Sequence, residues 1–248
     1  MSLERLTHTV EGRGMASWRR PGPGRPVVCV HGAGVSSREF LGLVEVLGEG
    51  HEAWTVDLPG FGHSAKPPAP LTLPELADAV ADWLEVAGLR QPCLLGSSFG
   101  CQVAVDLCVR YPDRVGALVL AGPTIDPHAR SPLGVFGQWL RNSVRESPSM
   151  APLNIADYRD AGARRVLATF GESIRDRIED KLPHVAVPAL VVRGGKDRMV
   201  PQAWAEEVTR LLPHGRLTVM PGLPHMVPYK DPHGLARRVV DFLAEVRP

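Results

Sequence analysis

The sequence predicts an α/β protein with a mostly parallel sheet and helices on both faces of the sheet. Short apolar segments such as PVVCV (26–30), CLLG (93–96) and ALVV (189–192) have the length of buried strands. They alternate with longer segments whose apolar residues recur at helical spacing, which is typical of strands joined by crossover helices. The 248 residues suffice for one large domain, or for one domain with an insertion.

The first half of the chain divides into expected strands and helices. Alternating segments at about 5–10 and 14–20, separated by EGRG, predict an antiparallel hairpin. A helix is expected at about 37–48, capped by Ser36 or Ser37, and another begins after Thr72 and ends at Gly88. The other expected elements of this half are the strands PVVCVH, EAWTVD, CLLG and GALVLAG and a helix from Ser98 to Tyr111.

The alternation breaks between about 124 and 182, where helical patterns occur without a convincing strand. GVFGQWLRNSV places Phe136 and Trp139 on one face, and ADYRDAGARRVLATF carries further apolar positions. We therefore predict an α/β core of residues 1–123 and 183–248, with a helical cap inserted at 124–182. The expected elements after the cap are the strands ALVVR and RLTVM and the helices 202–212 and 233–246.

Composition excludes several classes of function. The net charge of +1, without a long basic cluster, gives no footprint for nucleic acid or for an anionic membrane. No run approaches the roughly 20 apolar residues of a membrane span, and the first residues lack the apolar core of a signal peptide. We expect a cytoplasmic protein that acts on a small molecule; the sequence does not indicate its oligomeric state.

The four cysteines all lie in apolar stretches. Cys101 and Cys108 are two helical turns apart, roughly 10 Å, which is too far for a disulfide. We interpret all four as buried free thiols, which suits a reducing compartment. No spacing of His, Cys or carboxylate residues suggests a metal site, and we expect no cofactor.

The glycine-rich turn HGAGVSS has an alternative interpretation as a cofactor-binding site. It follows a strand and opens a helix, and Asp57 ends the next strand, which is nearly a dinucleotide-binding pattern. However, Ser37 occupies the third glycine position, and Asp57 runs directly into a second glycine turn, LPGFGHS. A tight strand-to-helix turn without chemistry remains another interpretation.

The segment GSSFG places Ser98 at the centre of a G-x-S-x-G pattern. Glycines on both sides permit the strained turn from strand to helix that pushes the central hydroxyl out above a sheet. The backbone N–H groups at the start of a helix favour developing negative charge. The alternative is that Ser98 simply caps a helix.

A serine nucleophile needs a base, and the base needs an orienting carboxylate. Asp197 follows one late strand in GGKDRMVP, and His225 follows the last strand in PGLPHMVP. The order Ser98, Asp197, His225 is the order expected with this elbow motif. Asp126, just past the sixth strand, is the rival for the acid.

The pieces HGAG, DLPGFGHSAKP, GSSFG, GGKDRMVP and LPHMVPYKDP stand in the order found in the α/β-hydrolase family, and the chain resembles that family over nearly its whole length. The resemblance implies an eight-stranded sheet, a helical cap after the sixth strand and a Ser/Asp/His triad. The sequence departs from the family pattern at Ser97, where His or Asn is frequent, and at Cys101, where a glycine is frequent.

These observations favour a carboxylesterase-like serine hydrolase in which Ser98, Asp197 and His225 are catalytic. The HGAG turn fits an oxyanion loop, with the backbone N–H groups of Ala33 and Phe99 as donors. A carbon–carbon bond hydrolase, an amidase and a small-ligand receptor with little turnover remain open. The expected substrate contacts are Trp139, His63 and Met226.

Overall fold

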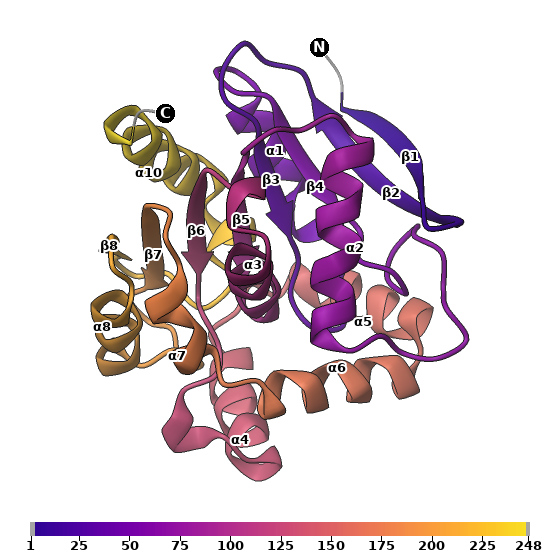
Figure 1. Ribbon diagram of the computed structural model, residues 1–248. Coiled ribbons are helices and arrows are strands. Elements are labelled where there is room, and N and C mark those ends of the chain that lie inside the picture. Colours follow the sequence, from indigo (N-terminus) through magenta and orange to yellow (C-terminus); the bar gives the residue numbers. More distant parts are fainter. Residues whose placement is uncertain (1–2, 247–248) are drawn as a thin grey trace.

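A computed structural model describes residues 3–246 and shows an eight-stranded sheet in the order β1-β2-β4-β3-β5-β6-β7-β8 (Figure 1). The hairpin of β1 and β2 is antiparallel and pairs antiparallel with β4, whereas all pairs from β4 to β8 are parallel. The predicted fold class is therefore confirmed. The strands are β1 (Glu4–Val10), β2 (Arg13–Arg20), β3 (Val27–Val30), β4 (Ala53–Val56), β5 (Cys93–Ser97), β6 (Ala117–Ala121), β7 (Ala189–Gly194) and β8 (Gly215–Met220).

The strands β1, β2 and β3 follow one another directly. From β3 on, helices alternate with the strands except between β6 and β7, where several helices follow one another. The helices outside that stretch are η1 (Ser37–Phe40), α1 (Leu41–Leu47), α2 (Leu73–Val86), α3 (Phe99–Arg110), η2 (Pro112–Arg114), α8 (Gln202–Leu211), α9 (Val227–Lys230) and α10 (Pro232–Glu245). Those between β6 and β7 are η3 (Pro127–Ala129), α4 (Pro132–Ser143), α5 (Met150–Ala161), α6 (Ala163–Arg175), α7 (Ile178–Lys181) and η4 (Leu182–His184).

The parallel strands divide their side chains between two apolar layers. On one face Val28, Leu94 and Leu118 pack with α2, α3 and α8, and on the other Cys29 and Leu95 pack with α1 and α10. Alternate residues of each strand point to opposite faces, so a strand covered on both sides must be apolar throughout. This explains the continuous apolar runs in the sequence.

The helices α4, α5 and α6 lie together at one end of the sheet, at the bottom of Figure 1. They follow β6 and therefore extend from the edge at which the parallel strands have their carboxyl ends. The sequence pattern at 156–170 belongs to two helices, because the chain turns at Gly162, which has a φ of 81°. The division into a core and a cap at 124–182 stays a prediction, and residues 1–2 and 247–248 of that division lie outside the described residues.

Two further expectations concern the cysteines and membranes. All four cysteines are buried and free, as predicted. Burial raises the pKa of each thiol, to about 12 for Cys93. Among residues 3–246, no helix combines the length and the apolar character that crossing a bilayer requires.

Candidate active site

Ser98 occupies a strained turn between β5 and α3. Its φ of 52° and ψ of −118° are sparsely populated for a residue with a side chain. The close approach of neighbouring backbone explains the two flanking glycines. A Cβ at Gly96 would collide with the carbonyl of Gly100, and one at Gly100 would collide with the carbonyl oxygen of Val30.

The two adjacent serines differ in accessibility. Ser97 is the last residue of β5 and is buried, whereas Ser98 is partly exposed. The Ser98 backbone N–H donates to the carbonyl oxygen of Ala121 over 3.0 Å, which ties the elbow to the end of β6. Because only Ser98 combines the strained turn with access to solvent, it is the better placed of the two hydroxyls to meet a substrate.

The structure brings Asp197 and His225 together from the loops after β7 and β8. His225 Nδ1 lies 2.8 Å from Asp197 Oδ2, and both side chains are buried. The second carboxylate oxygen, Oδ1, accepts the backbone N–H groups of Met199 (2.7 Å) and Val200 (3.0 Å), which orient the carboxylate. His225 Nε2 is buried and has no hydrogen-bond partner within the described part of the chain.

Close backbone contacts gather the elbow, the imidazole and the HGAG loop. A Cβ at Gly122, directly after β6, would lie 2.8 Å from His225 Cε1. A Cβ at Gly32 would lie 3.4 Å from Ser98 Cβ. Since Ala121 accepts the Ser98 N–H, the Gly122 turn links the serine to the imidazole. The three segments therefore meet at the carboxyl edge of the sheet, where open α/β folds bind ligands.

The charges around His225 favour its protonated form. Burial is the largest single effect and by itself lowers the pKa of the imidazole. The charge and hydrogen bond of Asp197, with smaller contributions from Glu146 and Glu39, outweigh burial and raise the pKa above the ordinary value of 6.5. The imidazole is therefore a stronger base than a free histidine.

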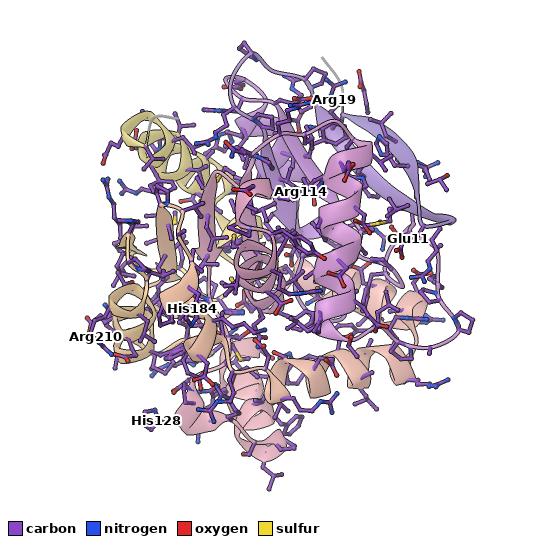
Figure 2. The ribbon with its side chains drawn as sticks, viewed as in Figure 1. Glu11, Arg19, Arg114, His128, His184 and Arg210 are labelled. Carbon is purple, nitrogen blue, oxygen red and sulfur yellow. The ribbon has the colours of Figure 1, made fainter. Side chains whose placement is uncertain are left out.

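The rival acid has a different partner. Asp126 Oδ1 accepts the backbone N–H of His128 and lies 3.0 Å from His128 Nδ1. His128 is a surface residue at the lower edge of Figure 2. His184, another histidine for which the sequence indicates no partner, is also exposed and labelled there. The geometry therefore pairs His225 with Asp197.

A hydrogen bond to the side chain of His31, the first residue of HGAG, ties this loop to the loop after β4. His31 is buried, and its Nε2 accepts the backbone N–H of Leu58 over 3.0 Å, in keeping with a structural role. Phe99 is the first residue of α3, so its N–H has no acceptor one turn earlier in the helix. Ala33, the other expected oxyanion donor, is partly exposed in the loop that packs against Ser98.

The dinucleotide interpretation is wrong, because Asp57 is occupied within the protein. Its side chain is fully buried, and its carboxylate accepts the backbone N–H groups of Ser37 (2.8 Å) and His63 (2.7 Å). Asp57 therefore joins the two glycine turns to each other and is closed to a ribose hydroxyl.

The three expected substrate contacts lie in different surroundings. Trp139 is 40% exposed, stacks on Phe136 with ring centroids 5.9 Å apart, and lines an apolar cavity of about 420 Å³. Met226 is partly buried beside His225. The exposed ring of His63 packs against Trp18 at 5.5 Å, and no contact given for the described residues joins that ring to the Asp197–His225 pair. The substrate roles of all three stay predictions.

Sequence reasoning did not place Glu146 or Glu39 at the site, and it expected Tyr158 only as an apolar residue of a cap helix. Glu146, after α4, accepts the backbone N–H groups of His225 (2.9 Å) and Met226 (3.2 Å). Tyr158 of α5 packs over the HGAG loop, with Cε1 2.6 Å from the position of a Cβ at Gly34. Glu39 is buried beneath that loop. Tyr158 left a signal in the apolar pattern of its segment, and Glu39 left one because it stands four residues before the apolar Leu43 and so shares its helical face. Glu146 left none.

Comparisons with known proteins place this geometry in a family. A model of the alpha/beta hydrolase family matches residues 27–238. The uncharacterized hydrolase YugF of Bacillus subtilis is 26% identical over 262 residues, which cover 95% of this chain and 96% of YugF. The pimeloyl-acyl-carrier-protein methyl ester esterase of Xylella fastidiosa is 28% identical over 235 residues, covering 80% of this chain and 86% of the esterase.

Solved structures agree in fold. A membrane phospholipase A described as a bacterial virulence factor superposes with a TM-score of 0.84 and 25% identity, covering 99% of this chain and 87% of the other. A thermophilic esterase from Thermogutta terrifontis superposes with a TM-score of 0.82 and 23% identity, covering 99% and 100%. Because the family model spans most of the sequence, the chain belongs to the alpha/beta hydrolase family.

Proposed function

We propose that the chain is a carboxylesterase-like serine hydrolase that cleaves an ester or related acyl bond of a small, uncharged substrate. The observation that carries the proposal is the strained, accessible Ser98 at the same edge of the sheet as an Asp197–His225 pair whose Nε2 is unpartnered among the described residues. A relative named as a methyl ester esterase supports an ester as the bond attacked.

In this mechanism His225 Nε2 removes the Ser98 proton as Oγ attacks the substrate carbonyl carbon. Asp197 holds the Nδ1–H tautomer and stabilises the imidazolium. The carbonyl oxygen becomes an oxyanion and accepts the N–H groups of Ala33 and Phe99. The imidazolium then protonates the leaving alcohol, which leaves an acyl group on Ser98. Water attacks that acyl group with His225 as base, and the acid and free Ser98 are released.

The α4–α6 segment supports an apolar substrate. The cavity of about 420 Å³ is lined on α4 by Val135, Phe136 and Trp139 and on α6 by Phe170 and Ile174. Tyr158 lines the same cavity and also packs over the HGAG loop, so it stands between the cavity and that loop. Ligand pockets are commonly apolar with a few polar groups. We infer that this segment is the cap of the site and receives an acyl or aromatic group of moderate size.

A larger hollow lies elsewhere and carries no comparable chemistry. A hollow of about 590 Å³ is lined by Gln91, which precedes β5, and by Arg114, which precedes β6 and is labelled in Figure 2. Both residues therefore lie at the amino edge of the sheet. The polar side chains of this hollow pair with each other, as Arg114 does with Glu85 at 2.7 Å. We therefore assign the substrate to the carboxyl edge of the sheet. A cytoplasmic location is a separate part of the same proposal.

The test is turnover by the purified protein on a panel of p-nitrophenyl esters of increasing chain length, matched amides and diketone-like carbon–carbon substrates. We expect hydrolysis of short and medium esters that depends on Ser98. Faster cleavage of the amides or diketones would reassign the bond to the amidase or carbon–carbon hydrolase class. Binding without turnover of any compound would make the protein a receptor of this fold and contradict the proposal.

A further inference from the structure

One buried acid next to the site has no part in the mechanism above. Glu39 lies in η1 and is 5% exposed. Its Oε1 accepts the backbone N–H of Gly32 over 3.3 Å, and its Oε2 has no hydrogen-bond partner within residues 3–246. A buried carboxyl without a cationic partner is costly as an anion, so its presence calls for a physical reason.

Glu39 binds the loop of the proposed oxyanion site and lies near the elbow and the base. Gly32, which it binds, immediately precedes Ala33 in the loop. The hydroxyl of Ser97, next to the elbow serine, lies close enough to lower the pKa of the Glu39 carboxyl. The charge of His225 acts on Glu39 in the same place. One carboxyl therefore binds the loop that carries the Ala33 N–H, and it lies close enough to Ser97 and His225 for both to affect its pKa.

The surroundings keep this carboxyl uncharged near neutral pH. Burial raises the pKa of Glu39 from 4.5 to about 8, although the Gly32 N–H, the charge of His225 and the Ser97 hydroxyl each oppose the change. Asp157 adds to the rise. The other titratable groups that feel Glu39 are Cys29 of β3, Cys101 of α3 and Tyr158 of α5, whose raised pKa values keep them neutral in this pH range.

We propose that Glu39 is a positioning residue whose neutral carboxyl braces the oxyanion loop against the elbow, and that a negative charge on it suppresses hydrolysis. The inference rests on the proposed function. The oxyanion forms one peptide unit away from the N–H that Glu39 accepts. A second negative charge in this buried, weakly screened place opposes the developing charge directly. Neutral Glu39 keeps the hydrogen bond to Gly32 without that repulsion.

The experiment compares the pH profile of kcat/KM for the wild type, Glu39→Gln and Glu45→Gln on a p-nitrophenyl ester, with Ser98→Ala protein as the background. Glutamine keeps the oxygen that accepts the Gly32 N–H but cannot ionise. We expect kcat/KM of the wild type to fall about fivefold between pH 8 and about pH 9, and that of Glu39→Gln to stay within about twofold. Glu45 is an exposed acid on α1, so Glu45→Gln controls for the loss of one charge and should follow the wild type.

A thermal unfolding series on the same proteins supplies a readout besides activity. The folded pKa of Glu39 lies above its unfolded value, so the wild type loses stability as pH rises between those two values. The Tm of Glu39→Gln should therefore gain on that of the wild type from about pH 5 to about pH 8 and then keep a constant lead. If glutamine prevents folding, carbon-13 NMR of labelled wild type measures the Glu39 titration directly, and an ordinary pKa there contradicts the inference.

The outcomes separate the inference from the function beneath it. If the wild type hydrolyses the ester and kcat/KM of Glu39→Gln falls above pH 8 as it does in the wild type, the role of Glu39 is overturned. The hydrolase proposal then still stands. Absence of turnover, together with absence of fluorophosphonate labelling at Ser98, overturns both. If Glu39→Gln does not show the fall of kcat/KM above pH 8, and its Tm gains on that of the wild type as pH rises, both the role of Glu39 and the hydrolase proposal are supported.

Discussion

Two helices of equal length show how differently the two parts of the molecule are built. Helices α3 and α4 each have twelve residues, yet ten residues of α3 are buried and only two of α4. Helix α3 packs among β3, β5, β6 and α2, so Ser98 at its start is held from several sides. Helix α4 leaves Leu133, Phe136 and Leu140 more than half exposed. The comparison suggests that the chemistry depends on rigid packing and that selectivity depends on a loosely packed surface.

The largest expected effect is at the start of α3. Ser98→Ala should remove at least about 10⁴-fold of kcat, because the nucleophile is lost while the donors of the oxyanion site remain. The alanine protein should unfold at nearly the same urea concentration as the wild type. A fluorophosphonate should label the wild type on Ser98, as mapped by peptide mass. A label on Ser97 would place the nucleophile one residue earlier.

The next effect concerns the acid. Asp197→Asn should lower kcat by about 10⁴-fold, because His225 loses the partner that holds its tautomer. It should also lower the apparent pKa of the acid limb of kcat/KM, which in the wild type lies above 6.5 because Asp197 favours the imidazolium. Asp126→Asn is the matched control and should leave both quantities nearly unchanged. The opposite ranking would give the acid role to the loop after β6.

A matched pair of leucines tests the packing difference itself. Leu107 of α3 is fully buried, whereas Leu140 of α4 is 53% exposed. Leu107→Ala should lower the free energy of unfolding by about 2–5 kcal/mol, since it leaves a cavity in a packed core. Leu140→Ala should change it by about 0.5 kcal/mol or less. Equal losses in urea unfolding would mean that α4 is packed as firmly as α3 in solution.

The smallest effect is on selectivity. Trp139→Ala should change the ratio of kcat/KM between an aromatic and a short aliphatic ester by about tenfold, because a large apolar contact with one substrate is lost. Leu133→Ala removes an exposed residue of the same helix outside the cavity lining and should leave the ratio unchanged. A uniform loss on all esters, or unfolding, would make Trp139 a packing residue and place selectivity elsewhere.

Local chemistry explains which parts could be predicted from the sequence. The apolar strands, the Thr72 cap of α2 and the glycines around Ser98 are set by neighbours within a few residues, so their patterns are visible in the chain. Thr72 indeed forms a capping box with Glu75. The pairing of His225 with Asp197 was expected from motif order and is present as a hydrogen bond, while their catalytic roles stay predictions.

The contacts missed are those between distant segments. Glu146 reaches the His225 loop across 79 residues, and nothing near Glu146 in the sequence marks it as an acceptor. Tyr158 was expected to carry the apolar face of a cap helix, but its position over Gly34 depends on how α5 is placed on the sheet. The α5–α6 break at Gly162 was also missed, because the apolar pattern continues across the turn.

Because all four cysteines are buried, we expect the native protein to react very slowly with thiol reagents. Thiolates are the reactive form, and burial with a raised pKa suppresses both access and ionisation. A thiol reagent should therefore react only when the sheet opens, so the rate of modification of the wild type reports global unfolding under native conditions. For the same reason, a single cysteine introduced at exposed Leu133 would be the one rapidly labelled thiol. A dye attached there would report movement of α4 without signal from the four native cysteines.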